Sequence, residues 1–211
     1  MFPMKIRYPK REQRKEQSST ALIGAAIDLF ANRGYEETTL ESVADKAGLH
    51  VQTLYRHFPT KSDLSQEISH EGLMKFEEYY RARECDALTA WRDWIKLRAR
   101  AVKKRGAAEY SQEIINLWSY PTTHTSKLKI SYRYEEVLAE GIAEDMNIDV
   151  NRDPLPLLIA CMLWGGNLHA VQDWANSGGK TDLEKVTLRV VDTVRDQFQH
   201  LLSGSKRHQS R

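Results

Sequence analysis

The sequence has little cysteine and little net charge. Its 211 residues include only two cysteines, Cys85 and Cys161, which lie far apart in the chain. This excludes a disulfide framework and the paired ligand spacing of a zinc site, so we expect no metal and no cofactor. It also suits a reducing cytosol. The sequence has 31 Lys and Arg and 29 Asp and Glu, so its net charge is small. Only the local distribution of charge can therefore attract an acidic partner.

Long apolar runs are also scarce. The N-terminal sequence MFPMKIRYPKREQRK lacks the apolar core of a signal peptide, so we expect a cytoplasmic protein. The segment 154–171, PLPLLIACMLWGGNLHAV, carries no Asp, Glu, Lys or Arg and approaches the minimum length of a membrane-spanning helix. Its prolines, its glycine pair and the polar Asn167 and His169 favour a buried helix of a soluble protein over a membrane span.

No enzymatic motif is complete. The sequence GGKT at 178–181 resembles the end of a phosphate-binding loop, but Trp174 occupies the position of the first required glycine. The pair His70 and Glu71 lacks the second histidine of a zinc-binding helix. Cys161 lies in an apolar run, where a small buried side chain is commoner than a nucleophile. We therefore expect a protein that is not an enzyme.

Two short amphipathic periods around a glycine predict a helix-turn-helix between residues 39 and 61. The first period is Leu40, Val43, Ala44 and Ala47, and the second is Val51, Leu54, Tyr55 and Phe58. Gly48 can take the positive φ at which a helix ends sharply, and Pro59 closes the second helix. Two short helices joined by a tight glycine turn are typical of DNA-binding proteins.

A third helix is predicted just upstream, from about Ser18 to Arg33, and it supplies the apolar surface that the short pair needs. The following helix begins at Thr38 or Thr39, since Thr38 and Glu41 have the spacing of a capping box. The residues before this unit, 1–17, are expected to form a flexible basic arm. It is either a solvated tail or a segment that contacts phosphates or the minor groove.

The segment ALIGAAIDLFANRGYEETTLESVADKAGLHVQTLYRHFPTKSDL resembles the DNA-binding domain of the TetR family of bacterial transcriptional regulators. The matching features are A-A-x-x-L-F-x-x-x-G-Y at 25–35, the paired threonines, V-A-x-x-A-G-L at 43–49, and T-L-Y-R-H-F at 53–58 followed by Lys61. The resemblance covers about the first third of the chain. It implies an all-α fold, with a helix-turn-helix domain at 18–65 and a helical effector-binding and dimerisation domain at 66–211.

The second helix of such a motif enters the major groove with its N-terminal residues, here His50, Val51, Gln52 and Thr53. Gln52 can pair with adenine, and a Val51 or Thr53 methyl group can touch a thymine methyl. The alternative for Gln52 is a solvated surface residue. The family often has a small hydroxyl residue in place of His50 and a glycine in place of Gln52. We therefore expect a weaker helix cap and a base preference that differs from that of relatives.

The resemblance also assigns contacts to the phosphate backbone. Tyr55 and His57 match positions that usually touch phosphates, and Arg56 between them is expected to reach a base or a phosphate. Lys61, at the start of the next helix, is expected to bind a phosphate together with the N-terminal N–H groups. Thr39 is expected to donate its hydroxyl to another phosphate, while Leu54 and Phe58 point inward.

The remainder is predicted to be helical. A long helix follows Thr60, with Asp63 at capping distance, and it runs to about Tyr80 as the link between the two parts. Further amphipathic segments lie at about Ala87–Arg105, Glu109–Trp118, Ser126–Met146, Pro154–Ala175 and Asp182–Leu202. In TetR-like proteins the last two helices pair with their copies, and a palindromic operator requires such a homodimer. The alternative for these apolar helices is packing within one chain.

An effector pocket is expected between the link helix and the dimer helices. Its candidate lining residues are Trp91, Trp94, Trp118, Tyr120, His124, Tyr132, Trp164, Asn167 and His169. Aromatic residues with scattered polar groups suit an apolar or aromatic ligand, although aromatics at helical spacing also fill cores. We therefore expect a repressor released from a palindromic operator by a small effector. The alternative is a DNA-binding regulator without a small ligand, controlled by a protein partner or acting architecturally.

Overall fold

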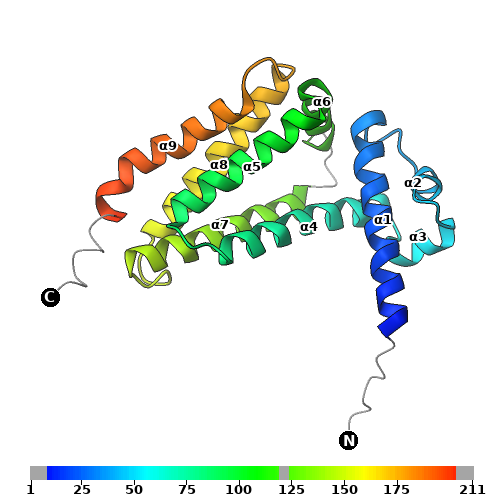
Figure 1. Cartoon of the computed structure of the whole chain (residues 1–211), viewed down its shortest axis with the longest axis horizontal. Helices are drawn as coiled ribbons and strands as arrows, with labels where there is room; N and C mark the ends of the chain where they lie inside the picture. Colours follow the sequence, from blue (N-terminus) through cyan, green and yellow to red (C-terminus); the bar gives the residue numbers. More distant parts are fainter. Residues whose placement is uncertain (1–8, 119–123, 203–211) are drawn as a thin grey trace, which may run out of the picture. The chain divides into compact units, whose positions relative to one another are not determined.

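The computed structural model describes residues 9–118 and 124–202, and every regular element in that part is an α-helix (Figure 1). The helices are α1 (Pro9–Arg33), α2 (Leu40–Lys46), α3 (Val51–His57), α4 (Lys61–Arg81), α5 (Ala87–Arg105), α6 (Ala107–Trp118), α7 (His124–Met146), α8 (Leu155–Asn176) and α9 (Leu183–Leu202). The all-α fold class is therefore confirmed. The chain divides into two compact units, Met1–Ile68 and Ser69–Arg211, and α4 begins in the first and continues in the second.

In the first unit, α1, α2 and α3 share one small core. Leu22, Ala26 and Phe30 of α1 are buried together with Val43 and Leu54. Gly48 joins α2 to α3 at φ 66°, the left-handed conformation expected at this turn. Helices α1 and α2 thus position α3 with one face inward and the other on the surface.

The sequence leaves open whether the second helix begins at Thr38 or at Thr39, and the structure assigns this position to Thr39. Thr39 is the N-cap, and its capping-box partner is Ser42, whose backbone N–H donates to Thr39 Oγ1 at 3.1 Å. The Ser42 hydroxyl, in turn, accepts from the Thr39 backbone N–H at 3.2 Å. Thr38 is buried instead, and its hydroxyl donates to the carbonyl of Gly34 at 2.7 Å. Thr38 therefore stabilises the C-terminal end of α1, and Glu41 is not part of the capping box of α2.

The basic N-terminal segment differs from the expected flexible arm. Residues 9–17 are the first turns of α1, so Arg14 and Lys15 stand on a helix, while residues 1–8 lie outside the described part. The sequence KREQRKEQ consists of good helix formers, and Pro9 occupies a first-turn position that suits proline. A run of charges that looks like a tail is thus continuous with the amphipathic helix that follows it.

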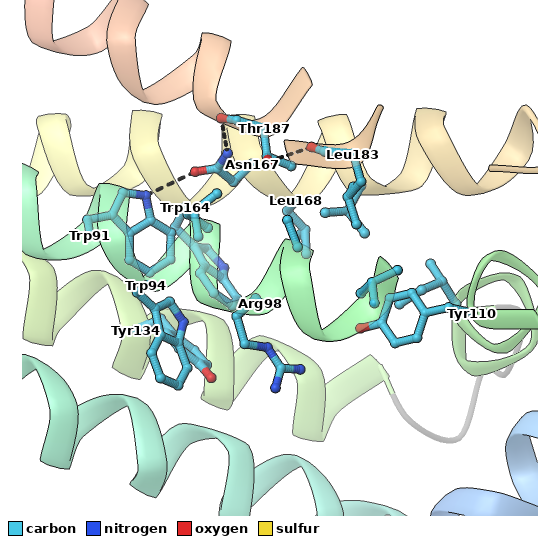
Figure 2. A pocket seen from close by; sticks show the side chains of 15 residues that line it. Trp91, Trp94, Arg98, Tyr110, Tyr134, Trp164, Asn167, Leu168, Leu183 and Thr187 are labelled. Carbon is cyan, nitrogen blue, oxygen red and sulfur yellow. Dashed lines mark hydrogen bonds between the residues drawn. The ribbon is translucent and has the colours of Figure 1, made fainter. Parts of the chain in front are cut away.

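The second unit is a helical bundle around an aromatic and aliphatic core. Its fully buried side chains include Phe76, Trp91, Leu138 and Leu163. One buried amide joins three helices. Asn167 Oδ1 on α8 accepts from Trp91 Nε1 on α5 at 2.9 Å, and its Nδ2 donates to the Thr187 carbonyl on α9 at 2.8 Å (Figure 2). Asn167 is 3% exposed, so this network fixes the register of α5, α8 and α9.

Gly166 sets the distance between α8 and α9. A Cβ atom at this position would lie 2.6 Å from Val190 Cγ1, whereas a Cβ at the neighbouring Gly165 would meet nothing within 4 Å. We expect Gly166→Ala to lower the free energy of unfolding by about 1–3 kcal/mol, because the helices must separate or Val190 must move. Urea unfolding measures this. Gly165→Ala is the matched control, and equal losses in both variants would contradict the close approach.

Candidate nucleic-acid interface and ligand cavity

Helix α3 is amphipathic in the sense that the sequence predicts. Leu54 and Phe58 are buried, with 0% and 6% of their surface exposed, which places them on the inward face as expected. Gln52, Tyr55 and Arg56 are exposed, and Val51 and Thr53 are half-buried. The residues predicted to meet base edges therefore stand at the accessible N-terminal end of a helix that a packed core holds from behind.

His50 caps α3, so the absence of a hydroxyl residue at this position does not leave the helix start uncapped. Its Nδ1 accepts a hydrogen bond from the backbone N–H of Gln52 at 3.3 Å, the interaction that a serine or threonine hydroxyl makes at this position. An accepting Nδ1 carries no proton, so the neutral imidazole has its proton on Nε2. The side chain is exposed. His50 thus combines an acceptor that holds the helix with a donor on the outer side of the ring.

Tyr55 has a partner within the first unit. Its hydroxyl donates to Glu41 Oε1 at 2.7 Å, and this bond joins α3 to α2. The hydrogen bond lowers the pKa of Glu41 and raises the pKa of Tyr55, so at neutral pH a phenol donates to a carboxylate. The one O–H donor of Tyr55 is therefore occupied. The predicted phosphate contact of Tyr55 requires the hydroxyl to leave Glu41.

The hydrogen bonds of Lys61 argue against its predicted contact with a DNA phosphate. Its ammonium donates to the carbonyls of Tyr35 at 2.6 Å, Glu36 at 3.1 Å and Thr38 at 3.1 Å, which accounts for all three donors. It also lies 4.4 Å from the centre of the Tyr35 ring. Lys61 thus holds the α1–α2 connection closed, and no N–H of the ammonium remains for a phosphate.

The N-terminus of α4 is occupied as well. The backbone N–H of Thr60 donates to Asp63 Oδ2 at 3.0 Å, and the Asp63 N–H donates to the Thr60 hydroxyl at 3.1 Å. This confirms the capping spacing read from the sequence. It also places a carboxylate where the predicted phosphate would sit, which is a second argument against anion binding at this helix end.

Positive charge gathers near the C-terminal end of α3. The pKa of His57 is lowered, first by partial burial and then by the charges of Lys15 and Arg56. His57 is therefore largely neutral at pH 7 in the protein without DNA. Within the described residues neither Lys15 nor Arg56 forms an ion pair, whereas Lys46 is paired with Asp28. Arg56 and the basic start of α1 are thus the available cations beside α3.

The second unit contains a cavity of about 220 Å³ to which α5, α6, α7, α8 and α9 all contribute (Figure 2). Most of its wall is aromatic or aliphatic, namely Trp91, Trp94, Ile95, Ala99, Val102, Tyr110, Ile114, Tyr134, Trp164, Leu168, Val171 and Leu183. Its polar wall residues are Arg98, Asn167 and Thr187. An apolar enclosure with a few polar groups is the usual form of a small-molecule site.

The cavity brings together four of the nine predicted pocket residues, which are Trp91, Trp94, Trp164 and Asn167. Tyr132 is 60% exposed and His169 is exposed, and neither lines the cavity, so these two predictions are corrected. Each lies two positions from a lining residue, about 200° around its helix, and therefore on the other face. The side chains of Trp118 and His124, and all of Tyr120, lie outside the described residues.

Arg98 and Tyr134 are wall residues that the sequence prediction missed. Trp91, Trp94, Arg98 and Val102 follow one another along a single face of α5, so spacing alone could have identified Arg98 as a charge on an apolar stripe. Tyr134 stacks on Trp164 with ring centres 4.0 Å apart. Burial raises the pKa of Tyr134 to about 12, although the nearby positive charge of Arg98 acts in the opposite direction.

Part of the first unit is similar to a known family. A family profile described as "Bacterial regulatory proteins, tetR family" matches residues 22–68. The transcriptional regulator TcmR of Streptomyces glaucescens is 34% identical over 55 residues, which are 26% of this chain and 24% of TcmR. The transcriptional repressor KstR2 of Rhodococcus jostii is 41% identical over 54 residues, 26% of each chain. The matched segments thus span about a quarter of these curated relatives.

The fold as a whole is shared with a solved structure. The transcriptional regulator FadR of Bacillus subtilis, solved in complex with stearoyl-CoA, aligns over 83% of this chain and 96% of its own, with a TM-score of 0.62 and 21% identity. This likeness concerns the arrangement of helices, and the sequence match concerns the helix-turn-helix. The N-terminal helix-turn-helix of this chain is thus similar to that of the TetR family of bacterial regulatory proteins.

Proposed function

We propose that this protein is a cytoplasmic transcriptional repressor that binds a palindromic operator as a homodimer and is released by a small apolar or aromatic effector. The observation that carries the proposal is the contact between the cavity wall and α4. Phe76 of α4 stacks on Tyr134 at 4.8 Å and packs against Trp94 at 5.5 Å, measured between ring centres. Helix α4 continues along the chain into the helix-turn-helix unit.

The proposed coupling follows from this contact. A ligand in the cavity contacts Trp94 and Tyr134, which line it, and Phe76 lies directly behind both rings. If the ligand prefers the arrangement of α4 that separates the reading helices, it lowers operator affinity by its differential affinity for the two states. The name of KstR2 as a repressor and the stearoyl-CoA in the FadR structure support this order of events.

The proposed dimer contact is the outer face of α8. Leu157, Leu158 and Met162 are 45%, 56% and 46% exposed, and Cys161 beside them is exposed as well. This helix is long and apolar enough to cross a membrane, and only 28% of its apolar window is buried. An apolar face of this kind on a DNA-binding protein is best covered by a second copy, which a palindromic operator also demands.

The alternative without a small ligand has less support. A closed core behind α4 would favour it, whereas the second unit has a cavity of about 220 Å³ lined by aromatic rings. A cavity of that size, whose wall α4 contacts through Phe76, suits a small ligand.

The test of this function is a comparison of ligand binding with operator binding. Small aromatic compounds are screened for those that raise the melting temperature of the full chain, since a ligand of the native state stabilises it. Operator affinity is then measured with and without a saturating amount of each. The proposal predicts a loss of roughly 5- to 150-fold, a typical coupling free energy. Compounds that bind the cavity and leave operator affinity unchanged would contradict it.

Gln52→Ala is expected to change the preferred operator rather than the general affinity for DNA. Gln52 is exposed at the start of α3, and loss of a bidentate contact to adenine costs about 1–3 kcal/mol of discrimination at one base pair. Selection of binding sites from a random duplex pool measures this. Gln66→Ala, an exposed glutamine on α4, is the matched control. Equal weakening on all sequences, without a changed preference, would assign Gln52 a phosphate contact instead.

A further inference from the structure

Two residues of the cavity wall carry N–H donors for which the described chain shows no acceptor. Trp164 Nε1 is inaccessible to solvent and has no hydrogen-bond partner among the described residues. Arg98 lines the same cavity, and no carboxylate of the described chain lies within ion-pair distance of it. Its nearest aromatic contact is Trp94, with the guanidinium carbon 6.0 Å from the ring centre. The buried indole N–H is costly without an acceptor, whereas Arg98 is exposed and its guanidinium is accessible to a ligand.

Three other basic side chains of α5 have an acidic partner. Arg92 pairs with Asp192 at 2.8 Å, Lys96 with Asp93 at 3.1 Å, and Arg100 lies 3.9 Å from Glu184. Arg98 alone among these four basic residues of α5 faces the cavity and lacks an acid. Figure 2 shows its side chain in the space between the Trp94 and Tyr134 rings on one side and Tyr110 on the other. The cavity therefore presents a positive charge with nothing in the described chain to neutralise it.

The size of the cavity limits what can neutralise it. A volume of about 220 Å³ exceeds the roughly 150 Å³ of an engineered cavity that binds benzene, and it falls below the 300–1,000 Å³ of drug-sized sites. A single aromatic ring with a short substituent fits between these limits. The walls suit a flat ring, because Trp91, Trp94, Tyr134 and Trp164 offer faces and edges for stacking.

We infer that the effector is a small aromatic carboxylate, whose ring lies among the tryptophans and whose carboxylate accepts from Arg98. A guanidinium matches a carboxylate in shape and charge, and hydrogen bonds between charged groups are the strong ones. A neutral aromatic compound of the same size leaves the guanidinium without a counter-charge. The inference rests on the proposed function, because it names the class of ligand for the same cavity.

The experiment compares matched probes on the full chain. Phenylacetate, 3-phenylpropionate and trans-cinnamate are titrated by calorimetry beside their neutral amides. At least one carboxylate is expected to bind about 10-fold or more tightly than its amide. Arg98→Gln should reduce the affinity for that carboxylate about 10-fold and change the affinity for the amide less than twofold. Arg100→Gln, two residues along the same helix and outside the cavity, is the control for net charge.

A second readout follows the orphan donor. In a spectrum of the protein with ¹⁵N-labelled indoles, the Trp164 N–H signal, assigned by its absence in Trp164→Phe, should shift with the carboxylate more than with the amide. Equal affinity for amide and carboxylate, or no binding of any probe at millimolar concentration, would overturn the inference. Carboxylate binding that leaves operator affinity unchanged would instead contradict the proposed regulation and leave the ligand class standing.

Discussion

Replacement of Leu158 and Met162 together by glutamate is expected to produce a monomer and to weaken operator binding by roughly 100- to 10,000-fold, the range over which linked binding sites gain affinity. Both side chains lie on the exposed apolar face of α8, at 56% and 46% exposure, one helical turn apart. Two carboxylates from each copy cannot be buried against each other without large desolvation and repulsion costs. Sedimentation equilibrium and operator titration of the same sample measure both effects.

The matched control is the pair Met74→Glu and Leu97→Glu. These side chains are 52% and 53% exposed and lie on α4 and α5, so the control adds the same charge to apolar surface away from α8. The control protein should remain a dimer with nearly unchanged operator affinity. A dimer in both double variants would show that the α8 face is not the subunit contact, and the account of palindrome binding would then need another surface.

Lys61→Met is expected to destabilise the helix-turn-helix unit by roughly 2–4 kcal/mol, since a hydrogen bond to a charged group contributes about 1.5–3 kcal/mol and part of the loss is recovered by hydration. The ammonium holds three carbonyls of the α1–α2 connection, and its side chain is 24% exposed. Chemical unfolding of the full chain, followed by circular dichroism, measures the effect. A loss of this size is at the upper end for a single substitution.

Lys46→Met provides the comparison for Lys61→Met. Lys46 also belongs to the first unit, but its ion pair with Asp28 is on the surface, with 43% and 49% of the two side chains exposed. Its loss should cost no more than about 1 kcal/mol. If Lys61→Met instead leaves stability unchanged, weakens binding to all DNA and flattens the salt dependence, then Lys61 is the phosphate ligand that the sequence suggests.

The extent of the helices was predictable because their determinants are local. Helix α5 runs from Ala87 to Arg105 as predicted, since Asp86 caps it and Gly106 ends it at a positive φ of 102°. Periodicity likewise identified the buried face of α3. The start of α1 was missed for the opposite reason, because a charged segment without an apolar stripe carries no periodic signal, even where its residues favour a helix.

Side-chain partners were less predictable because they come from distant positions. Lys61 finds its acceptors 23 to 26 residues back, and Tyr55 finds Glu41 14 residues back. Sequence spacing suggests which residues share a helix face, but it does not show which carbonyl or carboxylate lies opposite. The cavity shows the same limit. Its tryptophans were predicted from their type, and spacing places Arg98 on the same helix face, but spacing does not show that Arg98 lacks an acid beside it.

The central claim is that α3 reads a two-fold symmetric DNA sequence, and selection from a pool of random duplexes with the purified full chain tests it most directly. The account predicts enrichment of an inverted repeat whose half-sites are centred about 10–10.5 base pairs apart, or a multiple of that spacing, as two reading helices on one face of the duplex require. Enrichment of an asymmetric sequence, or recovery of the unselected pool at physiological salt, would contradict it.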